Sequence, residues 1–244
     1  TRINATILQH VLGDSAIKVV PQSIDEAIRN KNRACEVVAE NQGITALTAN
    51  IGSLVKVTNF DVSGNAIQKV PDQIGNMKRL TRMDLSDNEI QTLPGQVGYL
   101  SELREIDWSG NKLQEIPGQI SYMKKLTKMD VSDNEVREIP GQIGYLTKLV
   151  EVDWSGNKLE RLPLQISYMK EIKVLDLSDN QLVELPEHIG YFLQLERLDL
   201  RNNQLTKLPE RIDNLHRLKV LELGGNPLPP HEIDRVKRKL PNAK

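Results

Sequence analysis

Apolar and polar residues follow one pattern along most of the chain, and this pattern repeats every 23 residues. One unit, from Leu80 to Leu100, has the general form L-x-x-L-D-L-S-x-N-x-L-x-x-L-P-x-x-I-x-x-L. An asparagine stands at the same place in each unit, at Asn65, Asn88, Asn111, Asn134, Asn157, Asn180, Asn203 and Asn226. Because eight units keep this register without a gap, the chain is a repeat array in which each unit is one layer of a stack.

Each unit predicts a short strand followed by an extended return segment. Met83, Asp84 and Leu85 alternate as strand residues do. Stacked units would pair these strands in parallel, about 4.8 Å apart. No unit can enclose its own apolar residues, so neighbouring units must supply the walls of the core. Twenty-three residues leave too little chain for a full outer α-helix, and we expect extended or 3₁₀ segments there. The asparagine amide can satisfy turn backbone groups that would otherwise be buried unpaired.

The motif resembles the leucine-rich repeat family over residues 57 to about 228. It is most similar to the intracellular 23-residue type of the Ras-suppressor and scribble-type scaffolds and the plant Ras-group relatives. The resemblance implies an α/β fold, a leucine-rich repeat solenoid with a curved parallel β-sheet on its concave face and helical caps at both ends. It also implies an adaptor role in signalling, with a small GTPase or another signalling protein as the partner.

The ends of the array depart from the pattern, which suggests four segments. Residues 1–33 are expected to form an N-terminal helical cap, with helices over Ile3–Leu12 and from the capping box that opens at Ser23. Residues 34–56 fit the template loosely and form a degenerate first repeat. Residues 57–228 hold the leucine-rich repeats, and residues 229–244 a C-terminal capping helix over Glu232–Leu240.

Composition and motifs narrow the function. The net charge of -1 lacks the basic footprint of a general nucleic-acid binder, so we expect no nucleic-acid partner. No stretch approaches the roughly 18 apolar residues of a membrane span. The single cysteine, Cys35, favours a reducing compartment, and we expect a cytoplasmic monomer. No nucleotide, metal or nucleophile motif is found, so we expect no cofactor, no metal and no enzyme activity.

The strands carry the first candidate binding surface. We expect one outward carboxylate in the middle of each strand, at Asp61, Asp84, Asp107, Asp130, Asp153, Asp176, Asp199 and Glu222. Cations on the same face could equally well compensate these carboxylates and leave them a structural role. The candidate concave partner-binding set is Arg82, Asp84, Arg104, Asp107, Lys128, Asp130, Glu151, Asp153, Lys173 and Asp176.

The aromatic residues form two columns. Trp108 and Trp154 follow the strand aspartate, where other repeats have Leu or Val, and we expect both in the core. All the tyrosines fall in one convex column that is the alternative partner-binding surface, or that shields the core by ring stacking, at Tyr99, Tyr122, Tyr145, Tyr168 and Tyr191.

We therefore expect a noncatalytic protein–protein interaction module, an adaptor that binds a protein partner on its concave face. Two alternatives remain. The chain could be the sensor or regulatory domain of a larger signalling enzyme, or a fragment of an extracellular ligand-binding receptor.

Overall fold

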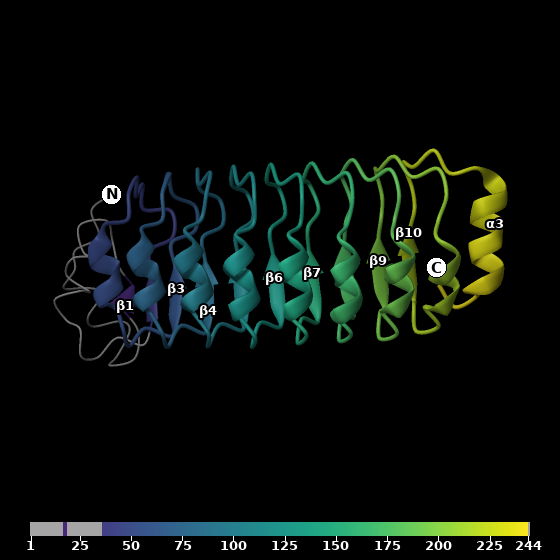
Figure 1. Ribbon diagram of the computed structural model, residues 1–244. Coiled ribbons are helices and arrows are strands. Elements are labelled where there is room, and N and C mark those ends of the chain that lie inside the picture. Colours follow the sequence, from purple (N-terminus) through teal and green to yellow (C-terminus); the bar gives the residue numbers. More distant parts are fainter. Residues whose placement is uncertain (1–16, 19–35, 244) are drawn as a thin grey trace.

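The protein is an elongated stack of repeats with its sheet on one face and short helices on the other (Figure 1). The computed structural model describes residues 17–18 and 36–243. A parallel sheet of ten strands runs through the stack in chain order, and successive repeats pair with a shift of 23 residues, as Arg82 does with Glu105. The strands are β1 (Ile17–Lys18), β2 (Glu36–Val38), β3 (Asn59–Asp61), β4 (Arg82–Asp84), β5 (Glu105–Asp107), β6 (Lys128–Asp130), β7 (Glu151–Asp153), β8 (Val174–Asp176), β9 (Arg197–Asp199) and β10 (Val220–Glu222).

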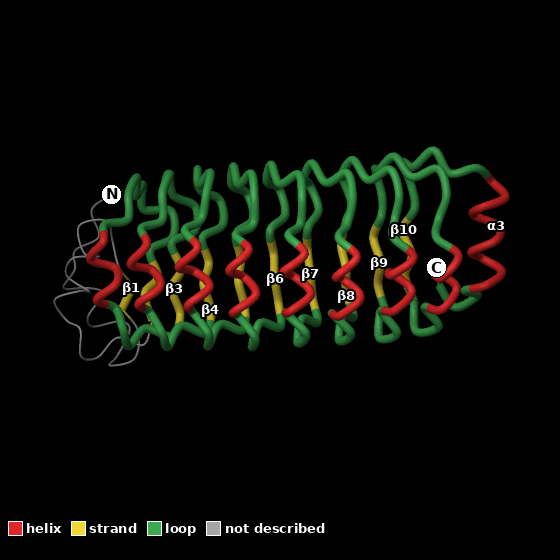
Figure 2. The backbone as a smooth tube through the Cα atoms, in the orientation of Figure 1, coloured by secondary structure: helices red, strands yellow, loops and turns green. Residues whose placement is uncertain are grey.

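The return segments contain 3₁₀ helices of five residues each, as expected from the short repeat (Figure 2). Proline directly precedes most of them, and its carbonyl accepts their first hydrogen bond, as Pro94 does from the Val97 N–H. Proline has no N–H to leave unpaired at that place. The helices are η2 (Ala49–Ser53), η3 (Asp72–Asn76), η4 (Gly95–Tyr99), η5 (Gly118–Tyr122), η6 (Gly141–Tyr145), η7 (Leu164–Tyr168), η8 (Glu187–Tyr191) and η9 (Glu210–Asn214).

One continuous aliphatic core lies between the sheet and the 3₁₀ helices. The middle residue of each strand from β2 to β9 points into it, as fully buried Met83 does. Trp108 and Trp154 are also buried, each with 1% of its surface exposed, which confirms their assignment to the core. Neither indole Nε1–H has a hydrogen-bond partner. Shape and apolar contact therefore hold these side chains in place.

The asparagine column ties each repeat to the one before it. The Oδ1 atom of Asn134 accepts a hydrogen bond of 2.9 Å from the Leu113 N–H. Its Nδ2 group donates to the carbonyl oxygens of Trp108, Val131 and Ser132 at 2.9, 3.2 and 3.0 Å. Two of these four groups belong to the preceding repeat, so the side chain closes its own turn and fastens the neighbouring turn as well. The predicted role of the column is confirmed.

The C-terminal end is closed by α3 (Pro230–Lys239), in the segment where the sequence predicts a helix. Glu232 accepts a hydrogen bond from the Leu208 N–H at 3.2 Å, and Arg235 donates to the Leu208 carbonyl at 3.0 Å. Arg235 also forms ion pairs with Asp213 and Glu232, both near 3 Å. These side chains satisfy the backbone groups of the last return segment that a further repeat would otherwise pair.

The N-terminal predictions fall mostly outside the described residues. The two expected cap helices and Cys35 lie there, and the proposed boundaries at residues 33, 56 and 228 stay predictions. Strand β1 pairs in parallel with β2, Ile17 with Val37, and the sequence analysis did not anticipate this strand. Its pairing offset is shorter than the 23-residue repeat, so the repeat template could not find it.

Two glycines in neighbouring 3₁₀ helices should respond differently to the same substitution. A Cβ atom on Gly144 would stand far inside van der Waals distance of the Gln165 backbone carbonyl, whereas one on Gly118 would be 3.5 Å from the Gln142 side chain. Gly144→Ala should therefore lower the free energy of unfolding by about 1–3 kcal/mol. Gly118→Ala should leave it unchanged or raise it by about 0.5 kcal/mol. Urea denaturation of both variants tests this, and equal effects would contradict the close packing of repeats at Gly144.

Candidate functional site

The open face of the sheet carries the first and third residues of each strand. In β4, Met83 is buried, so Arg82 and Asp84 project to the opposite, concave side. The expectation that the aspartates occupy the middle of the strands is therefore wrong, because they end each strand and the middle position is apolar. They are also less exposed than expected: Asp84 and Asp199 are buried, and the other five are half-buried.

Two members of the candidate concave set do not lie in the strand rows. Arg104 and Lys173 each precede a strand by one residue, because β5 begins at Glu105 and β8 at Val174. The backbone N–H groups of Arg104 and Glu105 both donate to the Thr81 carbonyl, and this local irregularity shifts the register of the preceding residue. The sequence analysis missed Glu105, which stands in the row with Arg82, Lys128 and Glu151.

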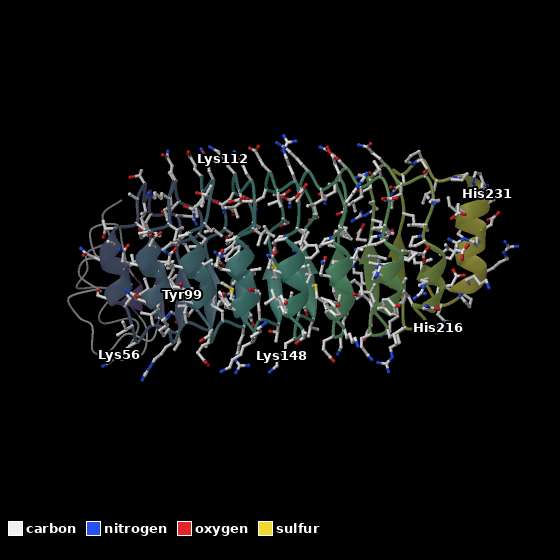
Figure 3. The ribbon with its side chains drawn as sticks, viewed as in Figure 1. Lys56, Tyr99, Lys112, Lys148, His216 and His231 are labelled. Atoms are coloured by element: carbon white, nitrogen blue, oxygen red, sulfur yellow. The ribbon has the colours of Figure 1, made fainter. Side chains whose placement is uncertain are left out.

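Ion pairs compensate the charges of the first row. Arg82 pairs with Glu105 at 3.4 Å, and Lys128 pairs with Glu151 at 3.6 Å. At one edge of the stack, where Figure 3 labels Lys112, the same alternation gives Lys112–Glu89 at 3.3 Å and a further pair one period on. Such exposed pairs contribute only about 0.2–1 kcal/mol each, and their larger effect here is to leave little net charge in this row.

The aspartate column is not compensated in the same way at its centre. Each carboxylate there accepts two hydrogen bonds from the serine two residues later, as Asp130 does from the Ser132 N–H at 3.0 Å and its hydroxyl at 2.7 Å. Among the ion pairs of the described residues, none involves Asp107, Asp130, Asp153 or Asp176. Burial, followed by the charges of Asp107 and Asp153, raises the pKa of Asp130. Burial and the neighbouring carboxylates raise the pKa of Asp176 in the same way.

The two flanks of the column have cations. Asp84 pairs with Arg82 at 3.3 Å, and Asp199 pairs with Arg197 at 3.0 Å and Arg201 at 2.8 Å. Burial acts to raise the pKa of Asp199, but the hydrogen bonds and charge of Arg201 outweigh it and hold this pKa below its ordinary value. Arg201 stands where the preceding repeats have serine, and this exchange was visible in the sequence. The uncompensated carboxylates therefore form a strip from β5 to β8, the residues Asp107, Asp130, Asp153 and Asp176, which we call the acidic strip.

Removing a charge at the centre and at the flank of the column should have opposite effects. The raised pKa of Asp130 means that its ionised form opposes folding above that pKa, and that this cost disappears as the pH falls through it. Asp130→Asn should therefore raise the free energy of unfolding at neutral pH by up to about 1 kcal/mol. Asp199→Asn should lower it by about 2 kcal/mol, because the lowered pKa marks stability that is present at neutral pH and lost in acid.

Urea denaturation of both variants and the wild type at neutral and acidic pH measures these differences. Both should shrink toward the acidic end. A loss of stability in Asp130→Asn equal to that in Asp199→Asn would contradict the uncompensated strip.

The tyrosines lie on the helix-bearing convex face, where Figure 3 labels Tyr99. Each ends a 3₁₀ helix, and the five side chains are between 43% and 62% exposed. No two tyrosine rings are in contact within the described residues, so the expectation that they stack on one another is wrong. Cations cover three rings instead: Lys78 over Tyr99 at 4.8 Å, Lys124 over Tyr145 at 4.5 Å, and Arg211 over Tyr191 at 5.4 Å.

The other two tyrosines have no such cation. Ser101 and Thr147 stand where Lys78 and Lys124 stand for the covered rings, so Tyr122 and Tyr168 present open ring faces. In the part of the chain that the structure describes, no group of His, Cys, Asp or Glu could hold a metal ion. Over the same residues, no helix combines the length and the apolar character that crossing a membrane requires.

Comparison with known proteins agrees with this geometry. The family model described as Leucine rich repeat matches residues 55–113 and 170–228, and the segment between these matches has the same alternation of strand and 3₁₀ helix. A sequence comparison with curated proteins gave no match.

Two solved structures show the same fold. An LRR protein of Leptospira interrogans is similar at 20% identity over 99% of this chain and 98% of that chain, with a TM-score of 0.51. The plant peptide hormone receptor RGFR1 in complex with RGF2 is similar at 23% identity over 82% of this chain and 34% of that chain, with a TM-score of 0.73. The repeats, their stacking and the matched family model together identify the chain as a leucine-rich repeat protein.

Proposed function

We propose that the chain is a noncatalytic interaction module, and that its concave face binds a protein partner through positive charges on that partner. Leucine-rich repeat domains generally mediate protein–protein interaction and are typically not catalytic. The observation that supports the concave face is the acidic strip: four carboxylates of adjacent strands with no cation of their own, at least two of which have raised pKa values. Lysine or arginine side chains of a partner would supply the missing compensation.

The shape of this surface favours a protein over a small ligand. The strip crosses four adjacent strands, so it extends roughly 15 Å along the stack. The serines hold each carboxylate in one orientation, as Ser132 holds Asp130, so little side-chain freedom is lost on binding. Uncompensated charge on a rigid surface also raises the rate of encounter with an oppositely charged partner.

The finer parts of the proposal rest on the sequence. An adaptor role of the Ras-suppressor or scribble type, with a small GTPase or another signalling protein as partner, rests on the likeness of the 23-residue repeat. A cytoplasmic location rests on the single cysteine. A monomeric state completes this proposal. Its alternatives are the regulatory domain of a larger signalling enzyme and a receptor fragment, and one structural neighbour is a receptor in complex with RGF2.

Affinity capture with a matched set of variants tests which face binds. Wild-type protein, a concave variant with Asp107, Asp130 and Asp153 each changed to Lys, and a convex variant with Tyr122, Tyr145 and Tyr168 each changed to Ser would be used as bait, and partners identified by mass spectrometry. We expect the concave variant to lose the protein that the wild type retains, and the convex variant to keep it. Retention by the concave variant and loss by the convex one would move the site to the tyrosine column.

A further inference from the structure

Two positions on the outer side of the stack change character in η7 and the return segment before η8. Leu164 opens η7 with 57% of its surface exposed, whereas glycine opens the three preceding helices and glutamate the two that follow. Val183 is 42% exposed at a position that is Gln, Arg or Glu in the preceding repeats and Thr in the next. Exposed apolar residues at otherwise polar positions have no role in the stack itself.

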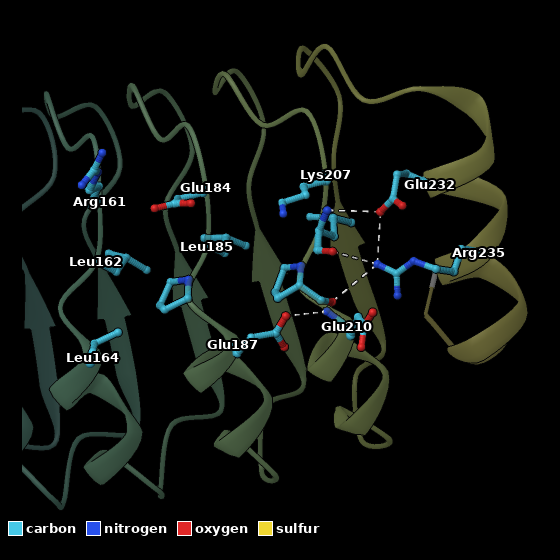
Figure 4. Close-up of a pocket in the computed structure, with 13 residues that line it drawn as sticks. Arg161, Leu162, Leu164, Glu184, Leu185, Glu187, Lys207, Glu210, Glu232 and Arg235 are labelled. Atoms are coloured by element: carbon cyan, nitrogen blue, oxygen red, sulfur yellow. Dashed lines mark hydrogen bonds and ion pairs between the residues drawn. The ribbon is translucent and has the colours of Figure 1, made fainter.

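A groove of about 640 Å³ opens beside these residues, between the return segments and α3 (Figure 4). Leu162 and Leu185 lie along its middle in the view. Leu164 and the 3₁₀ helices that begin at Glu187 and Glu210 form one side. Its other side carries Arg161, Glu184 and Lys207, one from each of three successive repeats, and α3 closes its end.

The charged groups of the groove fall into two kinds. Some already have partners: both carboxylate oxygens of Glu187 accept backbone N–H groups, from Glu210 at 3.0 Å and Arg211 at 2.9 Å. Glu232 and Arg235 are bound to each other and to Leu208.

Arg161, Glu184 and Lys207 are different. Among the described residues they form no ion pair, although charges that follow one another at the same 23-residue spacing do pair elsewhere, as Lys158 does with Glu135 at 2.8 Å. The open side of the groove therefore presents a positive, a negative and a positive charge in order along the stack, next to an exposed leucine.

We propose that this groove binds an extended segment of a protein partner that carries acidic, basic and acidic side chains at alternate positions, with apolar residues between them. In an extended chain, alternate side chains point the same way and are about 6.6 Å apart. The strands are about 4.8 Å apart, and the return segments are further apart because the stack curves around its sheet. Three alternate side chains of the segment can therefore meet Arg161, Glu184 and Lys207 in turn, and the residues between them face Leu164 and the leucines of the groove.

Two synthetic peptides of opposite charge order test the proposal. The first is acetyl-Glu-Leu-Lys-Leu-Glu-amide, and the second is acetyl-Lys-Leu-Glu-Leu-Lys-amide. Binding is followed by the methyl NMR shifts of Leu164 and Val183, with Asp107, Asp130 and Asp153 changed to Asn so that the concave face does not capture the basic peptide. The first peptide should bind the groove roughly tenfold more tightly than the second, because two or three exposed ion pairs distinguish them.

A charge-swapped variant makes the test specific. Arg161→Glu, Glu184→Lys and Lys207→Glu together should exchange the preference, so that the second peptide binds more tightly. Glu115→Lys with Glu138→Lys, at the same position of upstream repeats, should leave the preference as it was. Leu164→Gly, which restores the residue of the preceding repeats, should weaken both peptides by a similar factor.

All these positions are exposed, and thermal unfolding of each variant checks that it is folded. Equal binding of the two peptides, or a preference that the charge swap does not exchange, would overturn the proposal. Because the concave carboxylates are already removed in this assay, its outcome is independent of the proposed concave function.

Discussion

Replacing Asn134 with alanine should lower the free energy of unfolding by about 3–5 kcal/mol, one of the two largest effects expected in this protein. The substitution removes four hydrogen bonds, from the Leu113 N–H and to the carbonyls of Trp108, Val131 and Ser132. Asn134 is only 6% exposed, so water cannot readily replace the lost bonds. Each orphaned backbone group costs about 1–3 kcal/mol, and local relaxation recovers part of this.

Urea denaturation measures the effect, and two further variants interpret it. Asn134→Asp keeps the acceptor for the Leu113 N–H but turns a carboxylate toward three carbonyl oxygens. It should be less stable than the alanine variant at neutral pH and recover in acid, where the protonated form can donate one bond. Asn214→Ala, at an exposed position, should change stability by less than about 0.5 kcal/mol. A cost for Asn134→Ala below about 1 kcal/mol would contradict the proposed coupling of repeats.

Truncating Trp154 should have an effect of similar size for a different reason. The side chain is 1% exposed and fills the core next to the asparagine column. Trp154→Ala should cost about 3–5 kcal/mol, because the large cavity left behind cannot collapse between two fixed repeats. Differential scanning calorimetry or urea denaturation of the variant gives the value.

Trp154→Leu is the matched control for this truncation. Leucine occupies the same position in the repeats of Leu85, Leu177 and Leu200, and it has no N–H to bury, whereas the Trp154 Nε1–H has no partner. The leucine variant should therefore retain at least half of the stability that the alanine variant loses. Equal losses in the two variants would show that a specific indole contact, rather than volume, holds this part of the core.

The repeat unit could be predicted closely from the sequence because most of its information is local. Each asparagine, proline and leucine sits at the same place in every unit, so the stacking direction, the buried columns, the 3₁₀ segments and the role of Asn134 all follow from one template. The template fails where the interval changes. Strand β1 pairs with β2 at a shorter offset than 23 residues, and only the folded chain reveals it.

The candidate site was predicted less accurately, because a one-residue irregularity decides which face a side chain joins. The double hydrogen bond to the Thr81 carbonyl places Glu105, and not Arg104, at the first position of β5. The same effect separates Lys173 from the concave row. Likewise, periodicity alone could not tell that Lys78 lies over the Tyr99 ring, since this contact depends on the curvature of the stack and on side-chain rotamers.

The two proposed surfaces differ in how visible they were in the sequence. The acidic strip was visible as a column of aspartates, but its lack of cations became clear only when Arg201 and Arg82 were found beside the flanking members of the column. The outer groove was invisible as a motif. It arises from single departures from the repeat, such as Leu164 and Val183, whose meaning depends on the cavity between the return segments and α3.

The central claim is that the acidic strip binds positive charge at fixed positions. Isothermal titration with a pentalysine peptide, at low and at physiological salt, tests it most directly. The variant with Asp107, Asp130 and Asp153 changed to Asn should lose at least about tenfold in affinity and most of the salt dependence. A variant with Glu115, Glu138 and Glu160 changed to Gln loses the same charge outside the sheet and should bind as the wild type does. Equal losses in the two variants, or undiminished binding by the aspartate variant, would contradict the account.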